Sequence, residues 1–219
     1  MSDGQHAARL ARLSGFYGIV GDEGPLPPVA WAKALWAGGA CAVQLRFKRS
    51  TPREALALAR EIRAALPEAL LIVDDRPDLA VLAGADGVHV GETDLTPADA
   101  RRVVGPALLV GATARNGGAA REALAAGADH LGVGPVFPSR TKALDVPALG
   151  LAGLSAVCRA VAPAPVVAIS GIDEKNIAAV AGTGAACAAA IGAVGGSADP
   201  LDATRRLASA FTAGQLEAS

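Results

Sequence analysis

Hydroxyl and basic side chains gather in a loop at residues 134–142, directly after a predicted strand. The segment reads Gly-Pro-Val-Phe-Pro-Ser-Arg-Thr-Lys, and its last four residues present the two hydroxyls of Ser139 and Thr141 and the ammonium of Lys142. This combination is suited to holding a phosphate. Gly134 leaves room for a ligand near the backbone, and the two prolines stiffen the exit from the strand. Taken alone, the loop could equally be an ordinary strand exit with a surface lysine.

Three polar side chains alternate with two apolar ones at the end of an earlier predicted strand. Gln44, Arg46 and Lys48 are separated by Leu45 and Phe47. Side chains of a strand alternate between its two faces, so the three polar groups lie on one side. The two basic residues belong either to a solvated strand edge or to a functional site.

Carboxylates follow two further predicted strands. Asp75 stands directly after an apolar run, next to Asp74, and Asp94 lies a few residues beyond the following strand. Acids at adjacent strand ends, facing basic groups on neighbouring ones, suggest a divalent cation that bridges carboxylates and phosphate oxygens. Mg²⁺ suits this ligand set because it usually takes one or two carboxylates with water and substrate phosphate. Alternatively, Asp75 caps the helix that starts near Pro77, and Asp94 caps or turns the chain before Thr96.

Glycines occur just after the last two predicted strands. Gly171 follows the seventh strand, and Ile191 and Gly192 follow the eighth. Parallel barrels commonly bind phosphate at these positions, through exposed backbone N–H groups and the N-terminus of a short helix. The alternative is that both glycines serve only to turn the chain.

Short apolar runs alternate with Ala-rich helical patterns along the chain. Strands are predicted at 16–21, 40–46, 70–73, 87–90, 108–112, 130–134, 166–169 and 185–190. Helices are predicted at 28–38, 52–65, 76–83, 97–104, 117–126, 148–161, 174–181 and 199–213. Thr51 and Thr96 each stand before a proline and an acid, which is the pattern of a helix start. Gly84 and Gly127 end helices ahead of strands.

The order of these elements predicts a single (β/α)8 TIM barrel of the α/β class. A weak repeat relates residues 84–91 to 127–134, with helix stop, turn and strand in the same order. Eight βα units without a linker indicate one domain over 1–219, with 1–14 as an N-terminal extension that forms a surface helix or a frayed end. An open doubly wound sheet is the runner-up, weakened because no Gly-x-Gly-x-x-Gly follows the first strand. In a barrel, the polar strand ends meet at one face.

Four residues whose side chains could react or bind a ligand are expected in the core and not in the site. Cys41, Cys158 and Cys187 are widely spaced in apolar surroundings, which predicts buried thiols in a reducing compartment. His89 lies between two valines in a predicted strand and is interpreted as a core histidine with satisfied hydrogen bonds, in preference to a ligand.

Composition limits the class of partner. The formal net charge of -1 removes any global argument for nucleic acid or an anionic membrane, and an aromatic content of 3% offers little surface for stacking bases. No basic N-terminal segment precedes an apolar run, and no uninterrupted apolar stretch reaches about 18 residues. A soluble cytoplasmic protein that binds neither nucleic acid nor membrane is therefore expected.

Five motifs, in order and approximate spacing, resemble the thiamine-phosphate synthase family, within a superfamily that also contains thiazole tautomerases. The resemblance extends over roughly residues 16 to 205. The motifs are Gln44-Leu45-Arg46-Phe47-Lys48, Asp74-Asp75-Arg76, the segment 85–91 with Asp94, the loop 134–142, and Ser170-Gly171-Ile172.

The resemblance implies an alkyl transfer between two small phosphorylated substrates. A hydroxymethylpyrimidine group would pass from its diphosphate to the ring nitrogen of a thiazole phosphate, carboxylated or not, with release of pyrophosphate and with Mg²⁺ as cofactor. The residues implied to contact the pyrimidine diphosphate are Gln44, Leu45, Arg46, Phe47, Lys48, Asp74, Thr113 and Lys142. Those implied to bind the thiazole phosphate are Ser139, Arg140, Thr141, Gly171, Ile191 and Gly192. Asp75 and Asp94 would hold Mg²⁺, and the catalytic residues would be Arg46, Lys48, Thr113 and Lys142.

Several residues depart from the family pattern. Asp74 replaces an Asn, which adds a repulsive carboxylate beside a pyrophosphate unless the metal, Arg76 or Arg140 offsets it. Other departures are Thr113 for Ser, Ser170 for Gly, Gly192 for Ser, and Arg115 for the catalytic His of the tautomerases. The last argues against a tautomerase. A degenerate relative that binds a pyrimidine or thiazole phosphate without turnover is the other alternative, and a homodimer is possible on either interpretation.

Overall fold

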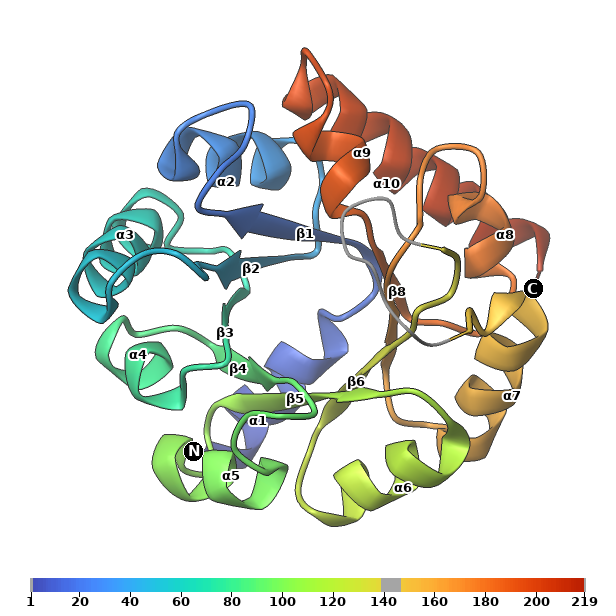
Figure 1. Cartoon of the computed structure of the whole chain (residues 1–219), viewed down its shortest axis with the longest axis horizontal. Helices are drawn as coiled ribbons and strands as arrows, with labels where there is room; N and C mark the ends of the chain where they lie inside the picture. The colour runs from blue at the N-terminus through green and yellow to red at the C-terminus, as the bar shows by residue number, and fades with distance from the viewer. Residues whose placement is uncertain (1, 139–146, 219) are drawn as a thin grey trace.

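The computed structural model describes residues 2–138 and 147–218, and within them eight parallel strands close into a barrel surrounded by helices (Figure 1). The strands are β1 (Gly15–Gly21), β2 (Ala42–Arg46), β3 (Leu71–Asp74), β4 (Gly87–Val90), β5 (Leu109–Ala114), β6 (His130–Val133), β7 (Val166–Ala168) and β8 (Cys187–Ala189). The strands pair in chain order, and β8 pairs with β1. The predicted TIM barrel is confirmed, and the open sheet is wrong.

The helices follow the predicted pattern with two additions. They are α1 (Ser2–Ala11), α2 (Pro28–Ala37), α3 (Pro52–Ala65), α4 (Pro77–Leu82), α5 (Pro97–Val104), α6 (Gly117–Ala125), α7 (Gly150–Val161), α8 (Ile177–Ala181), α9 (Ile191–Gly195) and α10 (Pro200–Glu217). The N-terminal extension forms α1, and the short α9 was not predicted. α8 starts three residues late because Asp173 and Asn176 form a turn, in which the Asn176 side chain accepts from the Asp173 N–H. Over the described ranges, every helix is too short or too polar to span a membrane.

Local signals in the sequence explain several helix ends. The Thr51 hydroxyl accepts from the Glu54 N–H and the Glu54 carboxylate accepts in return, so a complete capping box starts α3. Thr96 accepts from the Asp99 N–H at 3.1 Å and starts α5 in the same way. Gly84 and Gly127 take φ of 64° and 97°, which L side chains rarely adopt. Both helix starts and both helix stops are therefore confirmed.

The core has two layers. Side chains on the outer face of the strands, such as Val20, Leu45 and Leu71, are buried against the helices. A smaller cluster fills the barrel interior toward the N-terminal ends of the strands, and it includes Tyr17 and Ile72. Toward the other end the interior turns polar, which places the candidate site residues at the carboxyl ends of the strands.

Two histidines fill the barrel interior where neighbouring strands carry glycine. The rings of His89 and His130 lie 5.8 Å apart between centroids. Gly111 leaves the room for both, since a Cβ there would stand 2.5 Å from His89 Nδ1 and 2.5 Å from His130 Cε1. Real Cβ atoms essentially never come this close to another side chain.

We expect Gly111→Ala to lower the free energy of unfolding by about 1 to 3 kcal/mol, because overpacking a rigid interior forces side chains and backbone to shift. Urea unfolding checks this. Gly4→Ala in α1 is the matched control, because nothing lies within 4 Å of the Cβ it adds. Equal unfolding midpoints for the two variants would show that the interior has room to spare.

The internal repeat has a structural basis. Asp86 accepts from the Leu71 N–H at 2.9 Å and from Arg63 at 2.5 Å, and so ties the start of β3 to α3. Asp129 occupies the equivalent place, accepting from the Val110 N–H at 2.7 Å. Each aspartate thus joins the turn before its own strand to the strand before it.

Helix α1 docks on the same two aspartates. Arg9 donates from Nε to Asp86 Oδ1 at 2.9 Å, and His6 Nε2 lies 3.1 Å from Asp129 Oδ1. Arg101 pairs with the other Asp129 oxygen at 2.5 Å. The helix therefore lies against the N-terminal ends of the strands, opposite the polar strand ends.

The cysteines differ from the expectation in one respect. Cys158 and Cys187 are buried as predicted, but Cys41 is partly exposed. Cys41 lies one residue before β2, outside the regular strand, and this position leaves it less covered than a strand residue.

Candidate functional site

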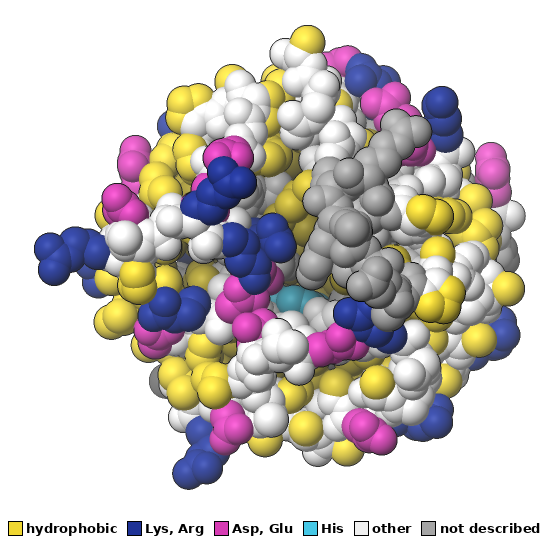
Figure 2. Space-filling view, viewed as in Figure 1, with side chains coloured by type: hydrophobic (Ala, Val, Ile, Leu, Met, Phe, Trp, Pro, Cys, Tyr) yellow, Lys and Arg dark blue, Asp and Glu magenta, His cyan; other side chains and the backbone are white. Residues whose placement is uncertain are grey.

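Charged side chains surround a hollow at the carboxyl ends of the strands. Figure 2 looks into this end and shows basic and acidic side chains side by side around the hollow, with a histidine at its floor. We refer to this hollow as the mouth. The sequence predicted that polar strand ends would meet at one such face, and those on β2, β3, β4 and β5 are in contact there.

A buried hydrogen-bond chain connects β1, β2 and β3. Tyr17 donates its hydroxyl to Gln44 Oε1 at 2.9 Å, and Gln44 Nε2 donates to Asp74 Oδ1 at 2.6 Å. Burial raises the pKa of Tyr17 well above its usual value, so the phenol stays protonated and can donate to the amide. An ionised carboxylate only accepts, so Asp74 takes the NH₂ group of Gln44 and leaves the amide oxygen for the Tyr17 hydroxyl. Tyr17 was not among the predicted residues, although period-two alternation from Ile19 places it inside the barrel.

The second oxygen of Asp74 faces two cations. Lys48 Nζ lies 3.3 Å from Asp74 Oδ2 and also contacts Asp75, and Arg46 Nε lies 3.5 Å from Asp74 Oδ2. Burial raises the pKa of Asp74, while the charges of Lys48 and Arg46 lower it and that of Asp94 raises it. Lys48 and Arg46 therefore supply the offset that this extra carboxylate needs.

The sequence suggested other cations for that role. Arg76 instead pairs with Asp78 at 2.6 Å on the surface, so it does not neutralise Asp74. Arg140 lies outside the described residues. The alternation of β2 explains the difference, since it brings Arg46 and Lys48 to the same side as Gln44.

Lys48 is held in place through its backbone. Asp22, just after β1, accepts from the Lys48 N–H at 2.5 Å and from the Arg49 N–H at 2.9 Å. The pKa of Asp22 is lowered: burial raises it, but the Ser50 hydroxyl and these N–H groups stabilise the charged form. Asp22 thus anchors the loop that presents the Lys48 ammonium. No motif in the sequence marked it.

Asp75 and Asp94 both lie near His89. Asp75 takes a φ of 63°, unusual for a residue with a side chain, and its N–H donates to the His89 carbonyl at 2.7 Å. Both carboxylates raise the pKa of His89 against the larger, opposing effect of burial. Strained backbone of this kind concentrates at functional sites. The helix-cap interpretation of Asp75 is wrong, since Arg76 occupies the N-cap position of α4 without a capping side chain.

The hydrogen bond of Asp94 agrees with its interpretation as a turn residue. Asp94 Oδ2 accepts from the Gly91 N–H at 2.8 Å, and Thr96 caps α5. Among the residues the structure describes, no three His, Cys, Asp or Glu side chains form a group that could hold a metal. Two carboxylates without further protein ligands fit Mg²⁺, which takes its remaining oxygens from water and phosphate. They do not fit a closed protein cage.

Thr113 shares a hydrogen bond with a buried imidazole. Thr113 Oγ1 lies 3.0 Å from His89 Nε2, and His89 is the core histidine with a satisfied hydrogen bond that the sequence predicted. His130 is fully buried beneath it, and neither of its ring nitrogens has a partner among the described residues. Burial lowers the pKa of His89 to about 4 and that of His130, with a further contribution from His89, to about 3.

These buried histidines predict acid sensitivity. Unfolded histidines bind a proton below about pH 6.5, whereas His130 in the fold does so only near its pKa of about 3. The unfolded chain therefore binds more protons in this window, and stability falls as the pH drops, by up to about 1.4 kcal/mol per unit for one histidine. We expect His130→Leu to have a shallower dependence between about pH 6 and 4, measured by urea unfolding. Plots of unfolding free energy against pH that run parallel for the two proteins would contradict this prediction. Asp74, whose pKa is also raised, is present in both proteins, so its contribution cancels in the comparison.

The end of β7 lies against the loop after β6. The Val136 N–H donates to the Ile169 carbonyl at 3.0 Å, and the Phe137 N–H donates to the Ser170 carbonyl at 3.2 Å. At Gly171, with φ of 68°, a Cβ would stand 2.6 Å from the Phe137 Cβ, so only glycine fits. The predicted site residues Ser139, Arg140, Thr141 and Lys142 follow this contact directly but lie outside the described residues.

Ser170 has two unusual properties. Its φ is 77°, and its hydroxyl oxygen is buried without a hydrogen-bond partner in the described part of the chain. A buried polar atom without a partner costs free energy, so it calls for an explanation such as a ligand. The sequence marked Ser170 only as a departure from the family pattern.

Ile191 and Gly192 form the first turn of α9. No side chain caps this helix, so its first N–H groups have no capping acceptor on the N-cap residue, Ala190. The sequence predicted a backbone donor site at these residues, and the short helix supplies the geometry for it.

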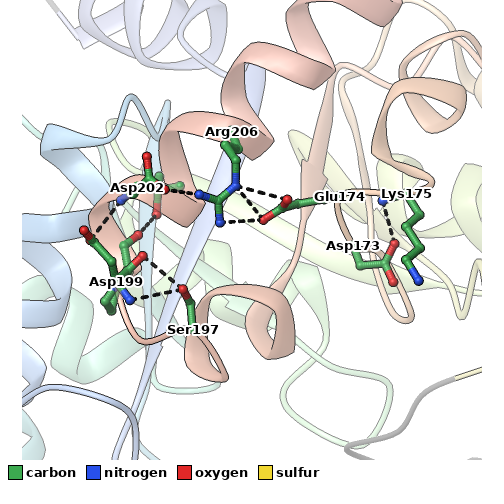
Figure 3. Close-up of polar contacts among 9 residues, drawn as sticks. Asp173, Glu174, Lys175, Ser197, Asp199, Asp202 and Arg206 are labelled. Carbon is green, nitrogen blue, oxygen red and sulfur yellow. Dashed lines mark hydrogen bonds and ion pairs between the residues drawn. The ribbon is translucent and has the colours of Figure 1, made fainter.

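An arginine of α10 holds the loop after β7. Figure 3 shows Arg206 between Glu174 and Asp202, with both Glu174 oxygens 3.0 to 3.1 Å from its guanidinium. Asn176 binds the other end of this loop, donating to the Gly171 carbonyl at 3.0 Å. Exposed ion pairs add little stability, so the main effect of these contacts is to position the loop.

Two residues that were predicted to contact substrate, and one that departs from the family pattern, have their side chains outside the mouth. Leu45 packs in the outer core between strands and helices, and Phe47 lies against the same layer, so their side chains point away from the three polar neighbours. Only backbone atoms of Leu45 can reach the mouth. Arg115 donates from Nε to both oxygens of Glu92, at 2.6 and 2.7 Å. This pair joins the loops after β4 and β5.

Comparisons with known proteins agree on one family. The family model described as thiamine monophosphate synthase matches residues 16–194. The chain is 55% identical over 210 residues to the thiamine-phosphate synthase of Anaeromyxobacter dehalogenans, covering 95% of this chain and 93% of that protein. It is 48% identical over 202 residues to the thiamine-phosphate synthase of Myxococcus xanthus, covering 90% of this chain and 92% of that protein.

Solved structures give the same picture. Thiamine phosphate pyrophosphorylase from Pyrococcus furiosus superposes with a TM-score of 0.85 at 35% identity, covering 93% of this chain and 98% of that one. A 3-hexulose-6-phosphate synthase superposes with a TM-score of 0.64 at 22% identity, covering 89% and 97%, and shares the fold alone.

Proposed function

Because this chain belongs to the thiamine monophosphate synthase family and is a transferase that forms thiamine phosphate, we propose that the reaction takes place at the mouth of its barrel. The substrates are a hydroxymethylpyrimidine diphosphate and a thiazole phosphate, and pyrophosphate is released. The observation that carries the location is the contact of Lys48 with both Asp74 and Asp75. This contact brings the Lys48 ammonium, which follows β2, together with the two carboxylates at the end of β3.

The diphosphate binds among the side chains of β2 and β3. Arg46 Nε and Lys48 Nζ lie 3.5 and 3.3 Å from Asp74 Oδ2, so both cations already face a carboxylate oxygen. Phosphate oxygens compete for the same donors. The Tyr17–Gln44–Asp74 chain keeps the amide and the carboxylate in one orientation while the cations turn toward the substrate. Lys142 is proposed as a further cation from the sequence alone.

Asp75 and Asp94 are the proposed ligands of Mg²⁺. Asp75 contacts Lys48, and both carboxylates act on the pKa of His89. Two such carboxylates beside a site for a diphosphate match the preference of this ion for a few carboxylates and phosphate oxygens. When bound, Mg²⁺ supplies positive charge that stabilises the departing pyrophosphate.

The thiazole phosphate binds at the ends of β7 and β8. Backbone N–H groups of Gly171, Ile191 and Gly192 are the proposed donors, and the Ser170 hydroxyl, which has no partner among the described residues, is an additional one. Ser139, Arg140 and Thr141 are proposed to complete this site on the evidence of the sequence. Two anions on opposite sides of the mouth leave the pyrimidine methylene and the thiazole nitrogen between them.

Charge development explains why these residue types are needed. As pyrophosphate leaves, negative charge builds on its oxygens and the methylene becomes cation-like, so Arg46 and Lys48 bind the transition state better than the ground state. The Thr113 hydroxyl, held by His89, is a neutral donor for the same oxygens. The scheme needs no strong general base.

The test is a turnover assay. The purified protein is incubated with both substrates and Mg²⁺, and pyrophosphate is measured together with thiamine phosphate. The expected result is stoichiometric formation of both products, dependent on both substrates and abolished by a chelator. Tight binding of either substrate without product would support the binding-only alternative, to which Asp74, Ser170 and Gly192 gave weight.

Compartment and assembly stay predictions from the sequence. A cytoplasmic location and a homodimer are proposed as before, and cell fractionation and light scattering respectively test them. The substrates themselves are small phosphorylated molecules, so the reaction calls for no macromolecular partner.

A further inference from the structure

Two cysteines far apart in sequence meet at the N-terminal end of the barrel. Cys41 and Cys187 are 146 positions apart, yet their Sγ atoms lie 3.7 Å from one another. Cys41 stands just before β2, and Cys187 is the first residue of β8. Both lie at the end opposite the mouth, and the proposed function uses neither.

A glycine of the intervening strand lies beside both cysteines. β1 runs between β2 and β8, and its first residue, Gly15, pairs with Cys187 (Figure 1). Even the Cβ of an alanine at Gly15 would already contact the Cys41 Cβ, at 3.8 Å. This is an ordinary van der Waals distance, and it shows that the backbone of Gly15 lies directly beside Cys41.

The two thiols have unequal surroundings. Cys187 is fully buried among the apolar side chains of the barrel interior, whereas Cys41 is partly exposed. Contact with the Cys187 thiol lowers the pKa of Cys41; burial opposes the effect, and nearby backbone N–H groups, including that of Ser14, add to it. Burial raises the pKa of Cys187 well above its usual value. A partly exposed, more acidic thiol beside a buried partner is the arrangement of oxidisable cysteine pairs.

We propose that Cys41 and Cys187 form an oxidation site, in which a small hydroperoxide converts the pair to an intramolecular disulfide that thiols reverse. The Cys41 thiolate attacks one peroxide oxygen and breaks the O–O bond, so that the peroxide is reduced to water and Cys41 becomes a sulfenic acid. The Cys187 sulfur then attacks the Cys41 sulfur, the S–O bond breaks, and hydroxide leaves as a second water with the Cys187 proton. One hydrogen peroxide thus takes two electrons and two protons from the pair.

Because β1 lies between the two strands, the bridge requires the backbone at Cys41 to move toward β8. The sulfurs must approach from 3.7 Å to about 2.05 Å, the length of a disulfide. Cys187 is fixed in β8, but Cys41 precedes the regular part of β2, and its N–H makes one bond, to the Phe16 carbonyl at 2.8 Å. The bridge would join the starts of β2 and β8 across β1. It leaves the mouth untouched.

The experiment uses the full chain with Cys158→Ser, so that only the pair carries thiols. The reduced protein is treated with hydrogen peroxide, alkylated, and measured by mass spectrometry before and after dithiothreitol. The expected result is a chain that has lost two hydrogens and takes up no alkyl group, with a peptide linking Cys41 to Cys187, and with both thiols restored by the reductant. In the Cys158→Ser, Cys187→Ser double variant, dimedone should trap a sulfenic acid at Cys41.

Three results would overturn the proposal. The pair could keep both thiols at a peroxide concentration that oxidises free glutathione. Cys41 could oxidise to sulfinic acid while Cys187 stays reduced. A disulfide could link two chains, seen as a dimer on a non-reducing gel, with no internal bridge. Thiol counts on the untreated protein establish that each variant is reduced at the start, and circular dichroism establishes that it is folded.

Discussion

Asp75→Ala lowers kcat by about 10²-fold, because removing one preorganised group that stabilises transition-state charge typically costs that much. Asp75 contacts Lys48 and lies beside His89 in a left-handed backbone conformation that holds its carboxylate toward the mouth. The substitution removes one of the two proposed Mg²⁺ ligands and leaves Lys48 with Asp74 as its remaining carboxylate partner. We expect the Mg²⁺ concentration for half-maximal activity to rise as well, measured from pyrophosphate release.

Asp78→Ala is the control for this variant. Asp78 lies three residues along the chain, pairs with Arg76, and is about half exposed, with 49% of its side-chain surface accessible. It carries the same charge and lies outside the mouth, so its kcat should stay within about twofold of the parent. Equal turnover of Asp75→Ala and Asp78→Ala would remove Asp75 from the reaction and, with it, the metal assignment.

Asp86→Ala lowers the free energy of unfolding by about 3 kcal/mol. The side chain is 14% exposed and accepts from Arg9, Arg63 and the Leu71 N–H. Removing it leaves the Leu71 N–H without its acceptor and leaves the Arg9 and Arg63 guanidinium groups with carbonyl acceptors but no carboxylate. Breaking largely buried charge pairs from one side costs several kcal/mol. Chemical denaturation measures the loss, and proteolysis near α1 should accelerate because Arg9 is one of the contacts that dock this helix.

Asp202→Ala supplies the comparison at the surface. Asp202 is 54% exposed and pairs with Arg206, so its loss should cost no more than about 0.5 to 1 kcal/mol. A similar cost for Asp86→Ala and Asp202→Ala would mean that the Asp86 contacts are as weak as a solvated ion pair.

Most of the fold, and the position of the site, could be predicted from local patterns in the sequence. Thr51, Thr96, Gly84 and Gly127 act over one or two turns of chain, and their roles follow from short-range hydrogen bonding and backbone sterics. Strand ends share one face of a parallel barrel by topology, so the meeting of the β2 and β3 polar groups also followed.

The remaining features depend on contacts between distant segments. The partners of Asp74, the docking of α1 on Asp86 and Asp129, and the pairing of Cys41 with Cys187 all depend on which strands become neighbours and on small residues between them. Tyr17 carried no signal because a buried tyrosine on an apolar strand looks like core. The unpartnered hydroxyl of Ser170 could only be recognised once its neighbours were placed.

The aspartates at the base of the barrel have a consequence for how this protein can change. Asp86 and Asp129 secure strand starts from below, using Arg63, Arg101 and the N-terminal helix, and none of these residues takes part at the mouth. The loops at the mouth can therefore be lengthened, shortened or substituted without breaking the Asp86 and Asp129 contacts that hold the strand starts in register. A library that randomises the loops after β7 and β8, where the acceptor phosphate is proposed to bind, while keeping both aspartates should yield mostly folded variants, and new acceptor specificities are best sought there.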